Sequence, residues 1–342
     1  MINAKPEVKF RLIREMTSRD NNLLNIKWLC EIAGVSRSGF YRWLEAEPVR
    51  SARDKRDEVD FALVQRAYQY RGYAKGARGV HMRLLRDKPS VVMNVKKIRR
   101  LMNKFGLHCP IRQANPYRRM MKALMTNKVA PNIVDRKFRS YGARNVLLTD
   151  ITYIPRGNGQ FTYLSVVIDA CTRQALAYQC SDSLEVDFVL ETVRKLIAHH
   201  GSTLNMGEKT LFHSDRGAHY TSHALTDLLG DAGLRQSMSR KANCWDNAPQ
   251  ESFFGHMKDE ISVVNCTHDQ ICAIINDWMD YYNNERYQWD LAKLSPNEFY
   301  DWLTTGLYPL GGSAPEPPEF SAFVFQSDEN DESGVDPPLV TS

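Results

Sequence analysis

The chain has 342 residues, a length that predicts roughly two or three domains. Its content of 43% hydrophobic and 25% charged residues is typical of globular proteins and excludes a wholly disordered or fibrous chain. No run of residues approaches the ~18 uncharged apolar positions of a membrane span, and the first residues lack a signal-peptide core. The 7 cysteines are scattered without a Cys-x-x-Cys pair, which indicates reduced thiols in a cytoplasmic protein and no zinc-ribbon site.

The net charge of +5 conceals a strong asymmetry along the chain. Residues 1–49 carry 8 basic and 6 acidic side chains, whereas residues 50–144 carry 25 basic and 6 acidic ones, an excess of +19. Residues 145–312 carry 12 basic and 21 acidic side chains, and residues 313–342 carry 7 acidic and no basic ones. A short charge run indicates only a solvated helix face, but so large an excess predicts contact with nucleic acid beside an acidic, metal-binding half.

Residues 26–44 have the pattern of a helix-turn-helix. Apolar side chains at positions 26, 29, 30 and 33 predict one helical face, Gly34 breaks that helix, and Ser36 is suited to cap a second helix over residues 37–44. A plain helical hairpin has the same pattern, so the motif does not establish DNA binding alone. In a helix-turn-helix the second helix enters the major groove, and there it would present to DNA Arg37, Ser38, Tyr41 and Arg42.

The next segments extend the basic half. Residues 51–110 are predicted to form a basic helical DNA-binding region, with Lys96 and Lys97 as candidate phosphate contacts. Its glycine-punctuated stretch at 71–79 lacks the Gly-x-Gly-x-x-Gly spacing, which excludes a dinucleotide site. Residues 111–144 are basic, polar and contain prolines, so we expect a linker that lies along a phosphate backbone.

From residue 145 the pattern becomes that of an α/β domain with a mixed sheet. Three β-rich runs come in series, with a hairpin turn at 156–159, and are followed by alternating helix and strand. We expect this core to extend to residue 305 and an acidic, disordered tail over residues 306–342. The predicted strands are 146–154, 161–169, 175–180, 210–213 and 233–238, and the predicted helices are 184–200, 222–231 and 250–258.

Three carboxylates in this core are candidate metal ligands. Asp150 interrupts an apolar, β-branched run, where burial is costly unless the side chain is paired or binds a metal; an outward-facing edge position is the alternative. Asp215 directly follows a strand, at the sheet end that faces the ligand crevice, although a turn residue or helix cap has the same appearance. Glu251 lies in the first turn of a helix, where an acid is also favourable for electrostatic reasons alone.

Together these side chains supply three oxygen ligands from separate elements of one unit. Carboxylate oxygens are the ligands that Mg²⁺ prefers, and a site with two Mg²⁺ or Mn²⁺ ions suits in-line displacement at phosphorus. Lys258 lies seven residues after Glu251, two helical turns along the same face, where it could contact a phosphate.

Long blocks around these residues resemble the Asp-Asp-Glu transposases of the insertion-sequence-three family, in the form made from the downstream reading frame. The resemblance spans about residues 26–305, and 35 residues separate Asp215 from Glu251, the spacing that this family shows. The matching blocks are residues 148–154, 213–222 and 239–254, and a C-terminal motif at 282–289 and 294–299.

The resemblance implies a ribonuclease-H-like, retroviral-integrase-like core behind the helix-turn-helix of residues 1–50. Asp150, Asp215 and Glu251 become the catalytic and metal-binding triad, and Lys258 contacts the reacting DNA end. Asp169 and Asp246 remain neighbours without a ligand role. The implied activity is metal-dependent nicking at the ends of a bacterial insertion sequence, followed by strand transfer by the freed 3′-hydroxyl. The implied partners are the terminal inverted repeats, target DNA, further copies of the chain and an upstream-frame protein, and the implied location is the bacterial cytoplasm, in association with the nucleoid.

Two other functions remain open from the residues alone. A non-catalytic helix-turn-helix regulator would use only the basic half, and loss of any triad carboxylate would favour it. A nuclease of ribonuclease-H type would share the chemistry without needing sequence-specific DNA recognition.

The histidines at 213, 219 and 223 lack the further ligands of a zinc set. We expect Tyr281, Tyr282, Tyr287 and Trp289 to be core aromatics, with stacking on DNA as the alternative.

Overall fold

The computed structural model describes residues 4–19, 24–110, 141–157, 159–204, 210–215, 217–238, 248–311 and 314–320. Most of the expected linker, and the tail beyond residue 320, lie outside the described residues. No helix in the described part of the chain is long and apolar enough to cross a membrane. The chain divides into two compact units, described separately below, which consist of Met1–Tyr70 with Met93–His108 and of Arg71–Val92 with Cys109–Ser342.

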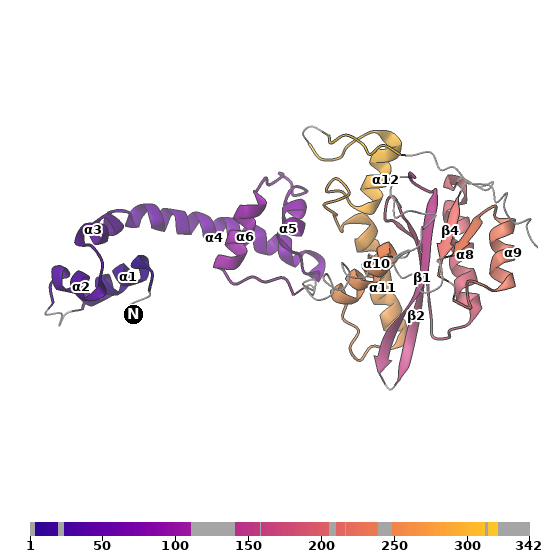
Figure 1. Cartoon of the computed structure of the whole chain (residues 1–342), viewed down its shortest axis with the longest axis horizontal. Helices are drawn as coiled ribbons and strands as arrows, with labels where there is room; N and C mark the ends of the chain where they lie inside the picture. Colours follow the sequence, from indigo (N-terminus) through magenta and orange to yellow (C-terminus); the bar gives the residue numbers. More distant parts are fainter. Residues whose placement is uncertain are drawn as a thin grey trace, which may run out of the picture. The chain divides into compact units, whose positions relative to one another are not determined.

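The first unit is entirely helical in its described residues (Figure 1). Its helices are α1 (Pro6–Thr17), α2 (Ile26–Ala33), α3 (Arg37–Glu45), α4 (Glu47–Gln69) and α6 (Val95–Lys104). The Ser36 side chain accepts a hydrogen bond from the Gly39 amide, and Gly34 ends α2 in the left-handed conformation at φ 63. The two helices and the intervening turn that the sequence predicts over residues 26–44 are therefore present.

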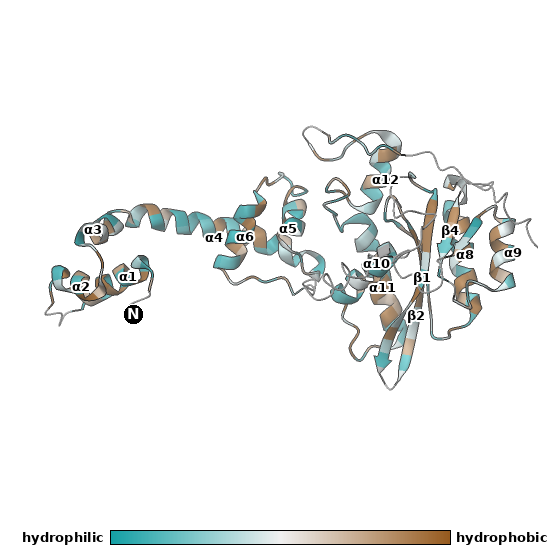
Figure 2. Cartoon of the chain, in the orientation of Figure 1, coloured by the Kyte–Doolittle hydropathy of each residue, from teal (hydrophilic) through white to brown (hydrophobic). Residues whose placement is uncertain are grey.

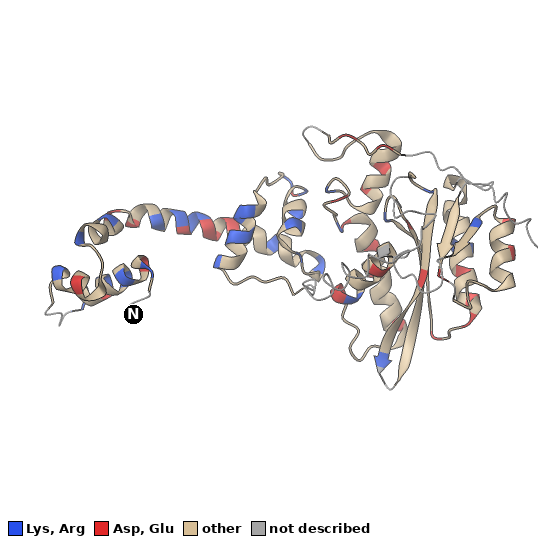
Figure 3. Cartoon of the chain, in the orientation of Figure 1, with Lys and Arg blue, Asp and Glu red and all other residues tan. Residues whose placement is uncertain are grey.

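A small aromatic core holds these first three helices together. Ile13, Leu29, Cys30 and Phe40 are buried, and the Phe10 ring packs 6.1 Å from Phe40 between ring centroids. The exposed side of α4 is mostly hydrophilic (Figure 2) and carries charges of both signs (Figure 3). Its acids pair with bases of α6, which places part of the basic excess in ion pairs within this unit.

The second unit contains a five-stranded mixed sheet in the order β3-β2-β1-β4-β5. The long β1 and β2 form an antiparallel hairpin, β3 pairs antiparallel with β2, and β4 and β5 run parallel beside β1. The predicted series of strands is confirmed, and Asn158 of the expected hairpin turn lies outside the described residues. The strands are β1 (Val146–Gly157), β2 (Gln160–Asp169), β3 (Ala175–Ser181), β4 (Leu211–Ser214) and β5 (Arg235–Met238).

Helices cover both faces of this sheet (Figure 1), which gives three layers and two apolar cores. Alternation along β1 sends Val146 and Leu148 toward one layer and Leu147 toward the other. The helix predicted from residue 184 begins at Val186, because Glu185 occupies the extended N-cap position. One layer contains α8 (Val186–His200) and α9 (His223–Asp231), and the other contains α10 (Ala248–Glu260) and α11 (His268–Asn284).

Two shorter helices complete the second unit, α5 (Ala77–Leu84) and α12 (Pro296–Thr305). The segment before α5 is anchored to α11, because Arg71 pairs with Asp277, Asp280 and Glu285 at 2.8, 3.1 and 2.6 Å. Tyr73 adds a hydrogen bond from its hydroxyl to Asp277 at 2.6 Å. The glycine-punctuated basic stretch is thus largely a packing element of the sheet-containing unit.

Candidate active site and nucleic-acid interface

Asp150 lies in the middle of β1, half-buried, directly opposite Val166 of β2 in the strand register. Every second side chain of a strand points to the same face, so Asp150 lies on the face of Val146 and Leu148. Its side chain therefore projects toward the layer of α10 and α11. One carboxylate oxygen accepts a hydrogen bond from the Ile151 amide at 2.8 Å. A carboxylate therefore stands on the central strand of the sheet, beside an apolar layer.

Asp215 is exposed and directly follows Ser214, the last residue of β4. Because β4 lies parallel beside β1, the ends of these strands bring Asp215 toward Asp150. The Gly217 amide donates to Asp215 Oδ1 at 2.9 Å, and a Cβ at position 217 would lie 3.0 Å from that oxygen. Glycine at 217 thus leaves the Asp215 carboxylate room to accept this hydrogen bond.

Glu251 is exposed in the first turn of α10. The opposite side of that helix is buried against the sheet through Phe253, Phe254 and Met257, which sets the direction in which Glu251 points. The neighbouring Gln250 is fully buried, and its Nε2 donates to the Val166 carbonyl at 3.3 Å. The helix that carries Glu251 is thereby fastened to β2 at the residue opposite Asp150.

The electrostatics join these carboxylates into one site. Burial, together with the negative charges of Asp215 and Glu251, raises the pKa of Asp150 to about 7. The Ile151 amide and the Lys258 ammonium act in the opposite direction on this pKa. Lys258 has a lowered pKa of its own, because it is partly desolvated, and Asp150 opposes that shift. Four groups from three elements therefore share one electrostatic environment.

The residues present fit a divalent cation by their chemistry. Three carboxylates repel one another in one environment, and the Lys258 ammonium offsets only part of the rise in the Asp150 pKa. A hard divalent cation would relieve this repulsion with the oxygen ligands that it prefers. Within the described ranges, however, no three His, Cys, Asp or Glu side chains stand ready to hold a metal ion. The segment 239–247, which precedes α10, lies outside those ranges.

Two residues of the site's surroundings escaped the sequence reasoning. Tyr220 is buried below the carboxylates, with its hydroxyl 3.3 Å from Thr149 Oγ1, on the opposite side of β1 from Asp150. Gln250 was recognised only as a neighbour of Glu251, although its burial makes it a link between helix and sheet. A polar residue directly beside the candidate metal ligand Glu251 was the available signal, but the contact of Gln250 depends on long-range packing.

Asp169 has a structural role. It is fully buried and accepts hydrogen bonds from the Arg144 amide and guanidinium at 2.8 and 2.9 Å, and from the Cys171 amide at 2.8 Å. Among the histidines, His213 contacts Ser237 at 3.1 Å and His219 contacts the Leu184 carbonyl at 2.9 Å. Asp246 lies outside the described residues.

The proposed DNA-reading side chains all lie on the surface of α3. Arg37, Ser38, Tyr41 and Arg42 are exposed, as a helix face that enters a groove requires. In the rest of the first unit, Lys96 is exposed, whereas Lys97 forms an ion pair with Asp60 at 2.6 Å. Lys96 is therefore the better candidate for a phosphate contact, because the charge of Lys97 is already paired with Asp60.

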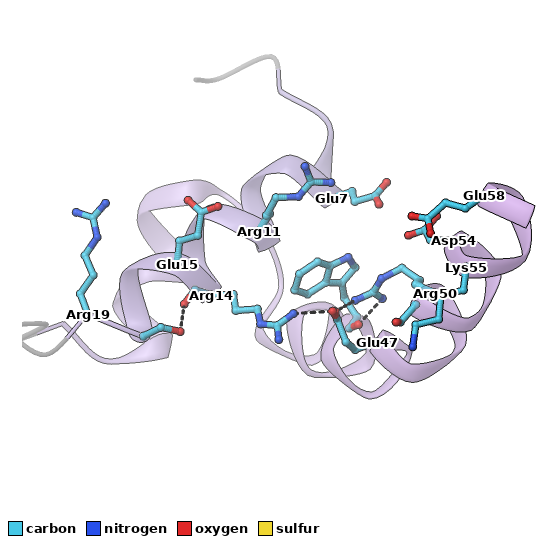
Figure 4. A pocket seen from close by; sticks show the side chains of 13 residues that line it. Glu7, Arg11, Arg14, Glu15, Arg19, Glu47, Arg50, Asp54, Lys55 and Glu58 are labelled. Atoms are coloured by element: carbon cyan, nitrogen blue, oxygen red, sulfur yellow. Dashed lines mark hydrogen bonds and ion pairs between the residues drawn. The ribbon is translucent and has the colours of Figure 1, made fainter. Parts of the chain in front are cut away.

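A hollow of about 930 Å³ lies between α1, α3 and α4 (Figure 4). Glu47 points into it and accepts from Arg14 at 2.8 Å and from Arg50 at 2.7 Å. Acidic and basic side chains alternate around the rest of its wall (Figure 4), so the hollow carries no field of a single sign. Its contacts tie the start of α4 to α1 and do not form an anion site.

Comparison with known proteins identifies the class that this fold and site define. Models of the integrase core domain match residues 141–244 and 232–296, and a model of an HTH-like domain matches residues 55–115. The chain is 30% identical over 273 residues to the putative transposase InsK for insertion sequence element IS150 of Escherichia coli K12. That match covers 79% of this chain and 92% of the relative.

Two further proteins are similar to parts of this chain. The 31 kDa protein of insertion element IS600 from Shigella sonnei is 27% identical over 274 residues, 79% of this chain and 97% of that protein. The catalytic core domain of HTLV-2 integrase in complex with magnesium has a TM-score of 0.37 at 13% identity, over 47% of this chain and 99% of that one.

This chain belongs to the insertion-sequence transposases, as an Asp-Asp-Glu transposase of the insertion-sequence-three family. It is an enzyme of DNA transposition and integration with an integrase core domain. The integrase-core family depends on divalent metal ions, and the HTH-like and integrase domains imply DNA binding. The sequence-based identification of family, fold class and activity is therefore confirmed.

Proposed function

We propose that Asp150, Asp215 and Glu251 are the catalytic triad and together hold two divalent ions, Mg²⁺ or Mn²⁺. The observation that carries this assignment is the shared electrostatic environment in which Asp215 and Glu251 raise the pKa of Asp150. When bound, the ions would activate the attacking oxygen and stabilise the leaving oxygen of an in-line displacement at phosphorus. The substrates are the insertion-sequence ends, nicked first, and then target DNA, joined to the freed 3′-hydroxyl.

The chain's own residues have separate tasks in this reaction. Asp150 supplies a carboxylate from the central strand of the sheet, and a site built on a strand is held more precisely than one built on a loop. Lys258 lies on the same helix as Glu251 and acts electrostatically on Asp150, so its ammonium is suited to neutralise a phosphate of the reacting DNA end. Gln250 and the buried face of α10 keep Glu251 in register with Asp150.

We further propose that residues 1–50 read the terminal inverted repeats and that residues 51–110 bind the phosphate backbone. The exposure of Arg37, Ser38, Tyr41 and Arg42 on α3 supports base contacts, and the basic excess supports backbone contacts. Residues 111–144 connect these regions to the catalytic core of residues 145–305, and residues 306–342 form an acidic tail. The enzyme acts on DNA as a homo-oligomer, with the upstream-frame protein as a second partner.

The triad is tested by charge-removing, shape-conserving substitutions in the full chain. Asp150→Asn, Asp215→Asn and Glu251→Gln should each abolish nicking of labelled donor ends with Mg²⁺, because the triad acts as a unit. Binding to the same DNA in EDTA should survive in all three variants. Asp227→Asn, an exposed acid of α9, is the matched control and should cut at the wild-type rate. A triad variant that still nicks near the wild-type rate would exclude that residue from the site.

A further inference from the structure

Trp289 is exposed where the surrounding aromatics are not. Tyr281 and Tyr282 are 3% exposed, and Tyr287 is half-buried, so the expectation of core packing is met for these three. Trp289 keeps 39% of its surface exposed, and that expectation is wrong for it. A single exposed aromatic ring is common on protein surfaces, so the side chains around Trp289 are what distinguish it.

Cationic side chains surround this ring. The Arg78 guanidinium lies 5.1 Å and the Lys293 ammonium 5.4 Å from the Trp289 ring centroid, and the His81 ring lies 6.0 Å away. Arg78 comes from α5 and Lys293 from the turn after Trp289, so the cluster joins segments distant in sequence. Neither Arg78 nor Lys293 forms an ion pair with a carboxylate of the described residues, whereas the nearby Arg86 is held by Glu298 at 2.5 Å.

The backbone below this cluster is firmly held. Gln288 and Leu294 form a β-bridge that closes the turn, and Arg86 donates to the Lys293 carbonyl at 3.0 Å. Within the turn, Ala292 and Lys293 have left-handed φ angles of 53 and 66. Two successive non-glycine residues rarely adopt this conformation, and strained backbone of this kind is concentrated at active sites and ligand-binding sites.

An adjoining hollow extends the positive surface. It has a volume of about 600 Å³ and shares His81 and Lys293 with the cluster around the tryptophan. Its wall adds the exposed Lys88, while its one carboxylate, Asp87, lies 3.7 Å from Arg83. Asp290 is the other acid beside Trp289, and it faces Arg173 at 3.7 Å. The unpaired charge of this surface is therefore positive.

We propose that Trp289, Arg78 and Lys293 form a contact surface for DNA with an unpaired nucleotide. The indole ring stacks on the unpaired base, and the two cations contact the phosphates on either side of it. A polyanion matches the unpaired cations, and an exposed indole suits any base, because every base has an aromatic face. The proposal rests on the proposed function only in taking DNA as the partner, and it requires no particular set of metal ligands.

The test measures binding by the full chain in EDTA, so that no cleavage contributes. Two DNA molecules are compared, a blunt duplex of an element end and the same duplex with a short unpaired 3′ tail containing 2-aminopurine. Trp289→Leu should lower affinity for the tailed DNA about tenfold and leave blunt-duplex affinity within twofold. Trp289→Phe should retain most of the affinity, and the 2-aminopurine quenching seen with wild type should be lost only in the leucine variant.

Two controls make the result specific. Phe161→Leu removes another exposed aromatic of the same unit, 38% exposed, and should change neither affinity. Replacing Arg78 and Lys293 by glutamine should reduce the salt dependence of tailed-DNA binding, whereas Arg194→Gln, on the exposed side of α8, should not. Equal loss on both DNA molecules, or no loss with Trp289→Leu, overturns the proposal. Failure of wild type to bind either DNA would instead contradict the proposed function.

Discussion

Arg286 donates hydrogen bonds to both carboxylate oxygens of Glu260, from Nε at 3.0 and 3.1 Å and from Nη2 to Oε1 at 2.8 Å. Glu260 is the last residue of α10 and also accepts from the Trp278 indole at 3.0 Å. The C-terminal sequence motif therefore holds one end of the helix whose other end carries Glu251. This contact explains physically why a motif distant from the triad accompanies it.

Breaking the ion pair between Arg286 and Glu260 should lower the free energy of unfolding. Arg286→Met leaves the Glu260 side chain, 3% exposed, without its cation, and we expect a loss of about 3–5 kcal/mol in the free energy of unfolding. Chemical denaturation followed by circular dichroism measures the loss. The double variant Arg286→Met, Glu260→Met removes both charges and should recover most of the stability. A loss below about 1 kcal/mol in the single variant would contradict the assigned role.

Gln250 should affect catalysis more than folding. Its Oε1 has no hydrogen-bond partner within the described structure, so Gln250→Leu removes one hydrogen bond while relieving one unsatisfied acceptor. We expect little change in melting temperature but roughly tenfold slower nicking, because Glu251 loses its fastening to β2. The metal concentration at half-maximal rate should rise as well. Ser252→Ala, an exposed neighbour on the same turn, is the control, and equal slowing in both variants would refute the positioning role.

The raised pKa of Asp150 gives a pH dependence of stability with a definite sign. Between pH 3.8 and about 7 the folded chain keeps a proton that the unfolded chain releases. Without metal, the free energy of unfolding should therefore fall as pH rises through this window, by at most about 1.4 kcal/mol per pH unit. Asp150→Asn should flatten that slope, measured by denaturant titrations in EDTA. The same slope in the variant and in wild type would show that Asp150 does not titrate in this window.

The lowered pKa of Asp57 predicts that the stability of the helical unit changes with pH in the opposite direction. Hydrogen bonds from Arg100 and Lys104 hold the pKa of Asp57 well below its usual range. The stability that this carboxylate contributes is present above pH ~4 and is lost as pH falls further. Asp57→Asn should therefore destabilise this unit at neutral pH and by a smaller amount near pH 2. Thermal melts at both pH values test this, and a destabilisation that persists undiminished near pH 2 would exclude the ion pairs as its cause.

The two candidate phosphate-binding lysines of α6 should differ. Lys96 is exposed, whereas the ammonium of Lys97 is 2.6 Å from Asp60, so Lys96→Gln should weaken DNA binding more than Lys97→Gln. Both effects should be similar for all DNA sequences and should reduce the salt slope. Replacing Arg37 and Arg42 should instead relax sequence preference, measured by competition between cognate and scrambled duplexes. Lysine variants that alter sequence preference would contradict this division of roles.

Local patterns in the sequence were sufficient for the elements that depend on near neighbours. The cap at Ser36 and the break at Gly34 follow from side-chain and backbone chemistry within a few residues. The strands around Asp150 follow from a β-branched run, and Asp215 at a strand end follows from the order of elements. Recognition of the family rested on long blocks whose order and spacing are linear properties of the chain.

Packing between distant segments decided the rest. Nothing near Trp289 in the sequence indicates that Arg78, more than 200 residues earlier, would cover part of its ring and leave the remainder exposed. Asp169 looked like a neighbour of the site until its burial against Arg144 gave it a structural task. Lys97 looked equivalent to Lys96 until α4 placed Asp60 beside it. The physical reason is common to all three, because ion pairing and burial depend on which surfaces meet in space, whereas periodicity and capping depend only on neighbours along the chain.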